Sequence, residues 1–156
     1  MAISAFQRVL PISSFVKILI LTALYPPLGA NGHDDRCRQV VDALSKRGHQ
    51  LQVLTSDHRV PLMGFSGQKG VYRQLQLHEV EGIECRLGVS YAATYELELV
   101  QARLLYNRLD RFQPDVVYVW NMQGVSKSLL FNLQNQGTPI AYDLHSNWLS
   151  PHLFEL

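Results

Sequence analysis

Glycines and acids gather in the segment "YPPLGANGHDDRCRQ" (Tyr25–Gln39), which joins an apolar run to a stretch with helical periodicity. Gly29 and Gly32 stand directly before the predicted helix. Glycine there lets backbone N–H groups approach a ligand closely, and a helix N-terminus favours negative charge or hydroxyl acceptors. A plain loop with positive φ explains the same glycines equally well. The fingerprint G-x-G-x-x-G and a Walker A sequence are both absent, which argues against an NAD or ATP site.

Histidine is the residue type in this chain best suited to proton transfer. His145 follows a predicted buried strand, where it could donate to a substrate hydroxyl or oxyanion, or accept a proton. On position alone, a loop histidine bonded to backbone is the better interpretation. His33 either faces a ligand or simply neighbours the helix N-terminus, and His49 is interpreted as structural.

The adjacent carboxylates Asp34 and Asp35 raise the question of a metal site. The sequence offers no identifiable third ligand and no D-x-D triplet, so capping of the helix and complementing its dipole explain them better. We therefore expect neither a metal nor a cofactor. The nucleophile elbow G-x-S-x-G is also missing. Asp57, at the end of the second predicted strand, lies where the ribose-binding acid of a dinucleotide site would stand.

Apolar periodicity predicts the elements that would position these residues. Residues 16–23 form a near-continuous aliphatic run typical of a central parallel strand, and Cys37, Val40, Val41 and Leu44 mark one face of a helix. The remaining predicted elements are strands at 50–56, 115–120 and 139–144, a strand or hairpin pair around Glu81–Gly82, and helices at about 97–112 and 125–136. This alternation predicts an α/β fold with a parallel sheet covered by helices on both faces.

Ligands of open α/β sheets bind beyond the carboxyl ends of the strands. The residues that the predicted strand ends bring there are Tyr25 to His33, Asp57, His58, Asn121 to Gly124, Asp143, His145, Asn147 and Trp148. We expect these residues to form a polar crevice with an aromatic rim.

Bulk composition narrows the classes of partner. The 156 residues suit one ordinary domain, and a formal net charge of +1 with mixed signs shows no basic stripe for nucleic acid. A polar or nearly neutral small molecule is the expected ligand. Cys37 and Cys85 are interpreted as reduced thiols, and the apolar stretch 15–24 is too short to span a bilayer. We expect a soluble cytoplasmic protein, with peripheral contact at the inner membrane face left open, and treat residues 1–14 as an extension of the domain 15–156.

Four segments together resemble a known family. They read "VKILILTALYPPLGANG", "LSKRGHQLQVLTSDH", "PDVVYVWNMQGVSKSLL" and "PIAYDLHSNWLSPH". In this order, over residues 16–152, they resemble the N-terminal domain of the retaining glycosyltransferase family 4. The resemblance implies one half of an enzyme with two Rossmann-like domains, the GT-B architecture. Such enzymes transfer a sugar from a nucleotide-sugar donor to an acceptor hydroxyl with retention of configuration, and the N-terminal domain mainly binds the acceptor.

The resemblance also assigns residues. His145 matches a family histidine that contacts the reacting sugar or acceptor, which makes it the predicted catalytic residue. Gly32 matches the glycine-rich loop beside the donor phosphates, and Asn31 stands where the family has a paired glycine. Many relatives have histidine where this chain has Trp120, so an acceptor contact there is altered. Position and resemblance together predict a binding set of Gly29, Asn31, Gly32, His33, Asn121, Trp120, Asp143 and Trp148.

The resemblance also implies partners, because it covers only the N-terminal domain of a two-domain enzyme. They are a nucleotide-sugar donor, a sugar, lipid or polyol acceptor, and a C-terminal domain or partner subunit carrying the family's E-x7-E carboxylates and phosphate clamp. Without it we expect no useful transfer, since the leaving diphosphate lacks electrostatic stabilisation. We also expect self-association through an interdomain surface near Trp120, Trp148 and Leu149. The alternative is a stand-alone, non-catalytic sugar- or nucleotide-binding module, and an NAD-dependent or phosphotransfer domain is disfavoured.

Overall fold

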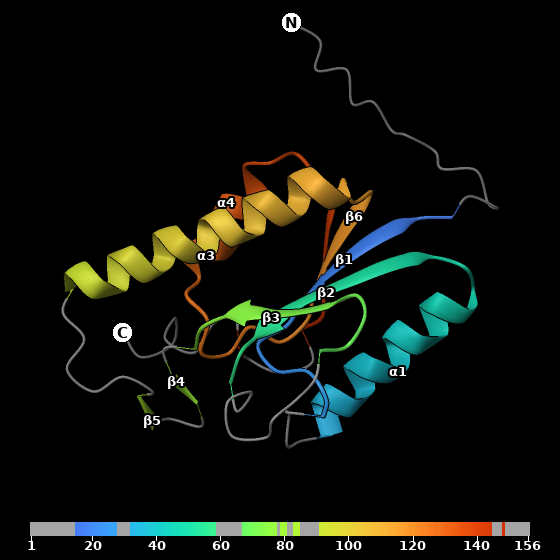
Figure 1. Ribbon diagram of the computed structural model, residues 1–156, viewed down its shortest axis with the longest axis horizontal. Coiled ribbons are helices and arrows are strands. Elements are labelled where there is room, and N and C mark those ends of the chain that lie inside the picture. Colours follow the sequence, from blue (N-terminus) through green and yellow to red (C-terminus); the bar gives the residue numbers. More distant parts are fainter. Residues whose placement is uncertain are drawn as a thin grey trace, which may run out of the picture.

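A computed structural model shows a parallel sheet of five strands in the order β3-β2-β1-β6-β7 (Figure 1). It describes residues 15–27, 32–58, 67–77, 79–80, 83–84, 91–144 and 148, with Gly32, His33, 79–80 and 83–84 described by their backbone. The strands of the sheet are β1 (Lys17–Leu21), β2 (Gln50–Ser56), β3 (Val71–Leu75), β6 (Val116–Val119) and β7 (Ile140–Tyr142). The described helices are α1 (Gly32–Lys46), α3 (Tyr91–Phe112) and α4 (Ser128–Gln134), and β4 (Glu79–Val80) pairs antiparallel with β5 (Ile83–Glu84).

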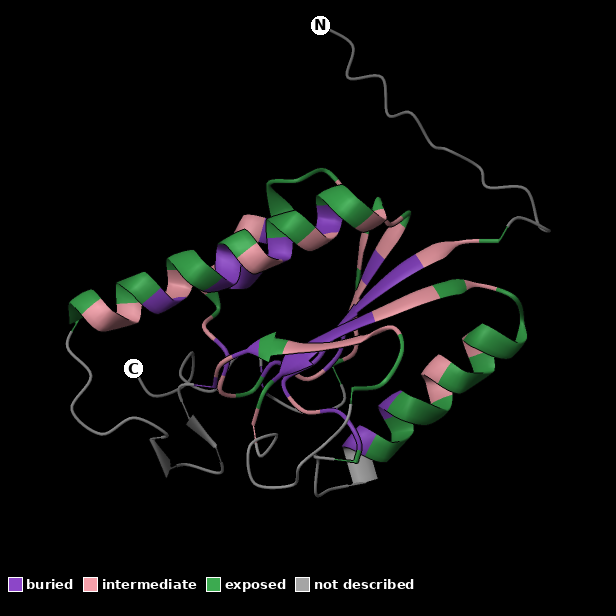
Figure 2. Ribbon diagram, viewed as in Figure 1, coloured by how far each residue is buried: buried purple, intermediate pink, exposed green. Residues whose placement is uncertain are grey.

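Helices cover both faces of the sheet, as the alternation predicts. Helix α1 lies on one face, and α3 and α4 lie together on the other (Figure 1). The aliphatic run of β1 serves both faces, because successive side chains of a strand point to opposite sides. Ile18 and Ile20 pack in the cluster under α1, while Leu19 and Leu21 pack in the larger cluster under α3 and α4. The outer surfaces of the helices are exposed (Figure 2).

The strand order reverses between β1 and β6, which pair with each other in parallel. The chain leaves β1 toward α1 on one face, and leaves β6 toward α4 on the other. A crevice between the two diverging loops, at the carboxyl ends of the strands, is the usual consequence of such a switch point. The predicted α/β class, with a Rossmann-like parallel sheet, is confirmed.

Two predicted helices begin at different residues in the structure. Helix α3 begins at Tyr91 rather than near Leu97. The prediction missed the first turns because they bury little, and the Tyr91 side chain is 97% exposed. Apolar periodicity therefore reveals only its buried part. Helix α4 begins at Ser128 rather than near Val125, since Gly124 adopts a φ of 78° and Val125 donates to the Met122 carbonyl in a turn.

The expected strand or hairpin pair around Glu81–Gly82 divides into two parts. Residues 71–75 join the main sheet as β3, parallel to β2 and at its edge. The hairpin is confined to two residues on each side, β4 and β5. The alternating pattern of residues 71–80 does not distinguish these outcomes, since an edge strand and a hairpin strand both expose one face.

The turn after α1 contains Gly48 and His49, and the structural interpretation of His49 is confirmed. Gly48 closes α1 with a φ of 89°, and its N–H donates to the Ser45 carbonyl at 2.9 Å. His49 is structural, because its Nδ1 accepts a hydrogen bond from the Val16 backbone N–H at 3.2 Å and so ties the start of β1 to the end of α1.

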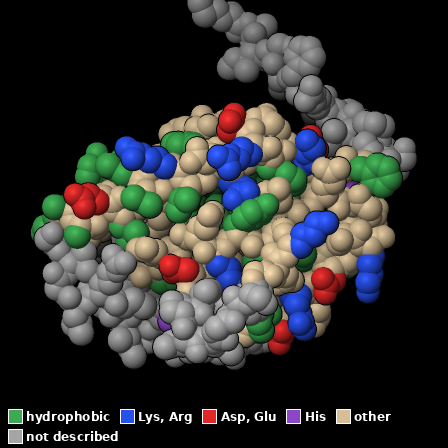
Figure 3. All heavy atoms as spheres, viewed as in Figure 1, with side chains coloured by type: hydrophobic (Ala, Val, Ile, Leu, Met, Phe, Trp, Pro, Cys, Tyr) green, Lys and Arg blue, Asp and Glu red, His purple; other side chains and the backbone are tan. Residues whose placement is uncertain are grey.

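Charges of both signs are interspersed over the face shown in Figure 3. Within the described ranges, no helix is both long and apolar enough to cross a membrane.

Candidate functional site

The carboxyl ends of β1 and β6 are held together beyond the last ladder residues. The Ala23 N–H donates to the Asn121 carbonyl at 2.6 Å, and the Trp120 N–H donates to the Leu21 carbonyl at 2.8 Å. The buried Thr22 hydroxyl donates to the Leu24 carbonyl at 2.9 Å. These bonds satisfy backbone groups just where the two chains diverge, so the base of the switch point is fixed.

Arg73 of the edge strand β3 anchors the loop that follows β1. Its guanidinium donates to the carbonyl oxygens of Tyr25 at 2.9 Å and Pro26 at 2.7 Å. It also lies over the Tyr25 ring, 5.9 Å from the centroid. Burial lowers the pKa of Arg73, yet arginine keeps its charge in proteins. A rigid two-pronged donor thus holds the start of the loop that leads to α1.

Helix α1 begins at this edge of the sheet, and its first turn carries two carboxylates in different surroundings. Asp34 is buried, with 2% of its surface exposed, whereas Asp35 is exposed and lies 3.6 Å from Arg38. Burial raises the pKa of the Cys37 thiol to about 12, and the negative charges of Asp34 and Asp143 raise it further in the same direction. Carboxylates from α1 and from the end of β7 therefore both lie near this thiol.

Asp143 follows β7 and is oriented by two aromatic side chains. The Tyr118 hydroxyl donates to Asp143 Oδ2 at 3.4 Å, and Trp148 Nε1 donates to the Asp143 carbonyl at 3.0 Å. Burial, and then the Asp143 carboxylate, raises the pKa of Tyr118. The Asp143 side chain is half-buried, so a positioned carboxylate stands at the carboxyl edge as the sequence predicts.

Trp120 is a core residue. It is 2% exposed, packs edge-to-face against Tyr118 with ring centroids 5.4 Å apart, and lies under the guanidinium of Arg36 at 5.9 Å. Trp148 is likewise buried, at 6% exposure. Neither tryptophan contributes to an exposed apolar surface, because α1 covers one and the cluster beneath α3 and α4 encloses the other. Self-association through the interdomain surface stays a prediction.

Asn121 is half-buried at the end of β6. Its Oδ1 accepts the Gln123 backbone N–H at 2.9 Å, in the side-chain turn typical of asparagine. The turn fixes the direction of the amide at the switch point.

Several predicted site residues lie outside the described residues: Gly29, Asn31, His145, Asn147 and Leu149, together with Cys85 and most of the loop 57–70. Gly32 and His33 form the start of α1, of which the backbone is described. The catalytic assignment of His145 thus stays a prediction.

Sequence reasoning did not find Arg73 or Tyr118, and it assigned Asp34 only to helix capping. The sequence places Arg73 and Tyr118 within predicted strands, where successive side chains point to opposite faces, and it offers no other signal for either residue. What each contacts depends on the neighbouring strand or loop, and that is a tertiary property.

The described site suits ligands rich in hydroxyl groups. The Asp143 carboxylate accepts hydrogen bonds, and the Asn121 amide and the Tyr118 phenol both donate and accept them. No group of three or more His, Cys, Asp or Glu side chains able to hold a metal occurs within the described part of the chain.

Comparisons with known proteins bear on the fold. Neither a protein-family model nor a curated protein matches the chain. A crystal structure of the C-terminal domain of a hydrogenase from Pyrococcus furiosus has a TM-score of 0.50 and 20% identity, covering 86% of this chain and 96% of that domain. A second crystal structure of that domain has a TM-score of 0.48 and 17% identity, covering 86% and 95%. At this identity the first likeness shows a shared α/β fold.

Proposed function

We propose that the chain is the acceptor-binding half of a retaining glycosyltransferase that uses a nucleotide-sugar donor. One observation carries the proposal: at the switch point, the loop after β1 is anchored by Arg73 and leads into α1 beside the ends of β6 and β7. The order of the four resembling segments supports the same reading, since three of them carry a polar residue just after a strand of the sheet: Asp57, Asn121 and Asp143.

Each residue at the crevice has a chemical role in this proposal. Asp143 accepts hydrogen bonds from acceptor hydroxyls, and Asn121 orients the same ligand through its amide. The backbone N–H groups at the start of α1, at Gly32 and His33, favour a hydroxyl oxygen of the acceptor. His145 contacts the reacting sugar, as the resemblance implies.

The nucleotide is assigned to a second domain or a partner subunit. Asp34 and Asp143 make this edge unfavourable for a diphosphate, because like charges repel. Stabilising the leaving diphosphate requires cationic groups aimed at it. The proposal places the protein in the cytoplasm, with the acceptor's membrane attachment deciding any peripheral contact.

Binding by the lone chain is the first test. Neutral acceptor-type glycans should shift the NMR signals of Asn121 and Asp143 saturably, and Asp143→Asn should weaken binding by about tenfold, as loss of a hydrogen bond to a charged group predicts. Asp42→Asn, an exposed change on α1, is the matched control and should leave affinity unchanged. No saturable shift at the carboxyl edge with any glycan would overturn acceptor binding.

Transfer is the second test. We would supply a C-terminal domain from a two-domain enzyme of the resembling family and a panel of UDP- and GDP-sugars, with His145→Ala as the control. Transfer that requires both parts and is lost in the variant supports the proposal. Saturable sugar or nucleotide binding without transfer, in a complex shown to assemble, favours the alternative of a non-catalytic binding module.

A further inference from the structure

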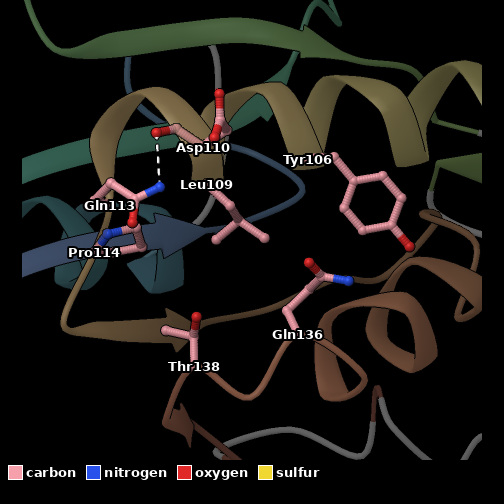
Figure 4. Close-up of a pocket in the computed structure, with 7 residues that line it drawn as sticks. All are labelled: Tyr106, Leu109, Asp110, Gln113, Pro114, Gln136 and Thr138. Carbon is pink, nitrogen blue, oxygen red and sulfur yellow. Dashed lines mark hydrogen bonds between the residues drawn. The ribbon is translucent and has the colours of Figure 1, made fainter.

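A hollow of about 440 Å³ lies at the amino ends of β6 and β7, at the opposite edge of the sheet from the candidate site. Its apolar lining consists of Tyr106 and Leu109 of α3 and Pro114 before β6 (Figure 4). Its polar lining consists of Asp110, Gln113, Gln136 and Thr138. We call this hollow the amino-edge pocket. Its volume falls within the range of about 300–1,000 Å³ that is usual for small-molecule sites.

The lining combines apolar surface with hydrogen-bonding groups. Leu109 is buried and lies between two sides of the pocket, with Tyr106 and Gln136 on one side and Gln113 and Pro114 on the other (Figure 4). Two amides and a hydroxyl can both donate and accept hydrogen bonds. A pyranose has the matching character, with C–H groups on its faces and hydroxyls around its edge.

Charge narrows the ligand further. Asp110 is the one charged side chain among the seven residues that line the pocket, and no lysine, arginine or histidine stands beside it there. A phosphorylated ligand would bring negative charge next to this carboxylate with no cation in the lining to balance it. We propose that the amino-edge pocket binds an uncharged carbohydrate of one or two sugar rings.

The pocket is held open by bonds that do not involve a ligand. Gln113 follows α3 in the left-handed region, with a φ of 51°, and its N–H donates to the Leu109 carbonyl at 2.8 Å. Glycine is the usual residue at this position after a helix. Here a glutamine takes the conformation instead, and its Nε2 donates to the Asp110 carbonyl at 2.8 Å. An amide is therefore kept at the pocket wall where glycine would fit the backbone better.

The opposite wall is fixed as well. The Gln136 N–H donates to the Leu133 carbonyl at 3.1 Å, and Gly137 turns the chain with a φ of 71° toward Thr138. Pre-formed walls lower the entropy that binding must overcome. The pocket lies at the edge opposite to Asn121 and Asp143, so this proposal stands independently of the glycosyltransferase proposal.

The test is an NMR titration of the full chain with glucose, galactose and maltose, and with glucose 6-phosphate as the charged counterpart. We expect saturable shifts at Tyr106, Gln136 and Thr138 with a dissociation constant on the order of 1–10 mM. Glucose 6-phosphate should bind more weakly than glucose. Absence of saturable shifts at these residues up to about 50 mM of every neutral sugar would overturn the proposal.

Two variants separate binding from folding. Tyr106→Ala should weaken sugar binding about tenfold, whereas Tyr95→Ala, an exposed tyrosine outside the pocket on the same helix, should not. Gln113→Gly removes the amide but suits the left-handed backbone, so affinity should fall while the midpoint of urea unfolding holds or rises. Unchanged affinity in both Tyr106→Ala and Gln113→Gly would refute the assignment. Loss of the sugar-induced NMR shifts in Asp143→Asn would also refute it, because Asp143 lies at the opposite edge of the sheet.

Discussion

Arg73→Met removes the guanidinium that anchors the loop after β1 and keeps most of the aliphatic stem. Two hydrogen bonds to a charged donor are lost, at 2.9 and 2.7 Å. Such bonds contribute about 1.5–3 kcal/mol each, and the lower value applies because Arg73 is half-buried and competes with water. The contact with the Tyr25 ring adds about 0.5–1 kcal/mol. Allowing for non-additivity, we expect the free energy of unfolding to fall by about 3 kcal/mol.

Arg73→Lys should cost about half as much, because one ammonium group cannot bridge both carbonyl oxygens as the planar fork does. Urea unfolding followed by circular dichroism measures both losses. Arg38→Ala is the matched control: its exposed pair with Asp35, 3.6 Å apart, should contribute less than about 0.5 kcal/mol.

A loss below about 0.5 kcal/mol in Arg73→Met would refute the anchoring argument. The position of the loop provides a second readout, because the amide signals of Leu24 and Tyr25 should shift or broaden in this variant. A large loss of stability that leaves those signals unchanged would place the effect elsewhere on β3.

Three further predictions concern single positions. Burial raises the pKa of Cys37 to about 12, so the folded state keeps this proton while the unfolded thiol loses it from about pH 8.5. The free energy of unfolding should thus fall as pH rises from about 8.5 toward 12. This decrease with pH should be smaller in Cys37→Ala, and an equal decrease in both proteins would contradict the role of Cys37. Gly48→Ala and Gly137→Ala should each cost about 1 kcal/mol in urea unfolding, since both have positive φ. A Cβ at Gly48 would lie 2.5 Å from the Phe15 ring, but Phe15 is 73% exposed and its ring can turn away, so the two losses of stability should agree. A much larger loss for Gly48→Ala would show that the Phe15 ring is held in place. Trp148→Phe should lower stability by about 1–2 kcal/mol through the lost bond to the Asp143 carbonyl and a small cavity, and an unchanged unfolding midpoint would contradict that contact.

Local sequence patterns predicted most elements of the fold because each pattern reflects burial within one element. The aliphatic run of residues 16–23 marked the central strand, and Cys37, Val40, Val41 and Leu44 marked the buried face of α1. The exposed first turns of α3 gave no such pattern, so its start was placed six residues too late.

Positions at the candidate site were predicted less completely. Strand ends in the sequence placed Asn121 and Asp143 at the carboxyl edge, since parallel strands bring their ends to one edge. The resemblance placed Trp120 in the binding set, yet its ring packs under α1. A residue at the end of a strand can point to either face, and the sequence does not tell which face a helix covers.

The sequence by itself determined that this chain alternates strands and helices around a parallel sheet, because apolar periodicity is set within each element. Only the tertiary structure decided which distant residues meet: Arg73 at the carbonyls of Tyr25 and Pro26, the Tyr118 hydroxyl at Asp143, and the walls of the amino-edge pocket. These contacts join residues up to 48 positions apart in the chain. Their geometry follows from strand order and from the faces that the helices cover, which no local pattern of side chains encodes.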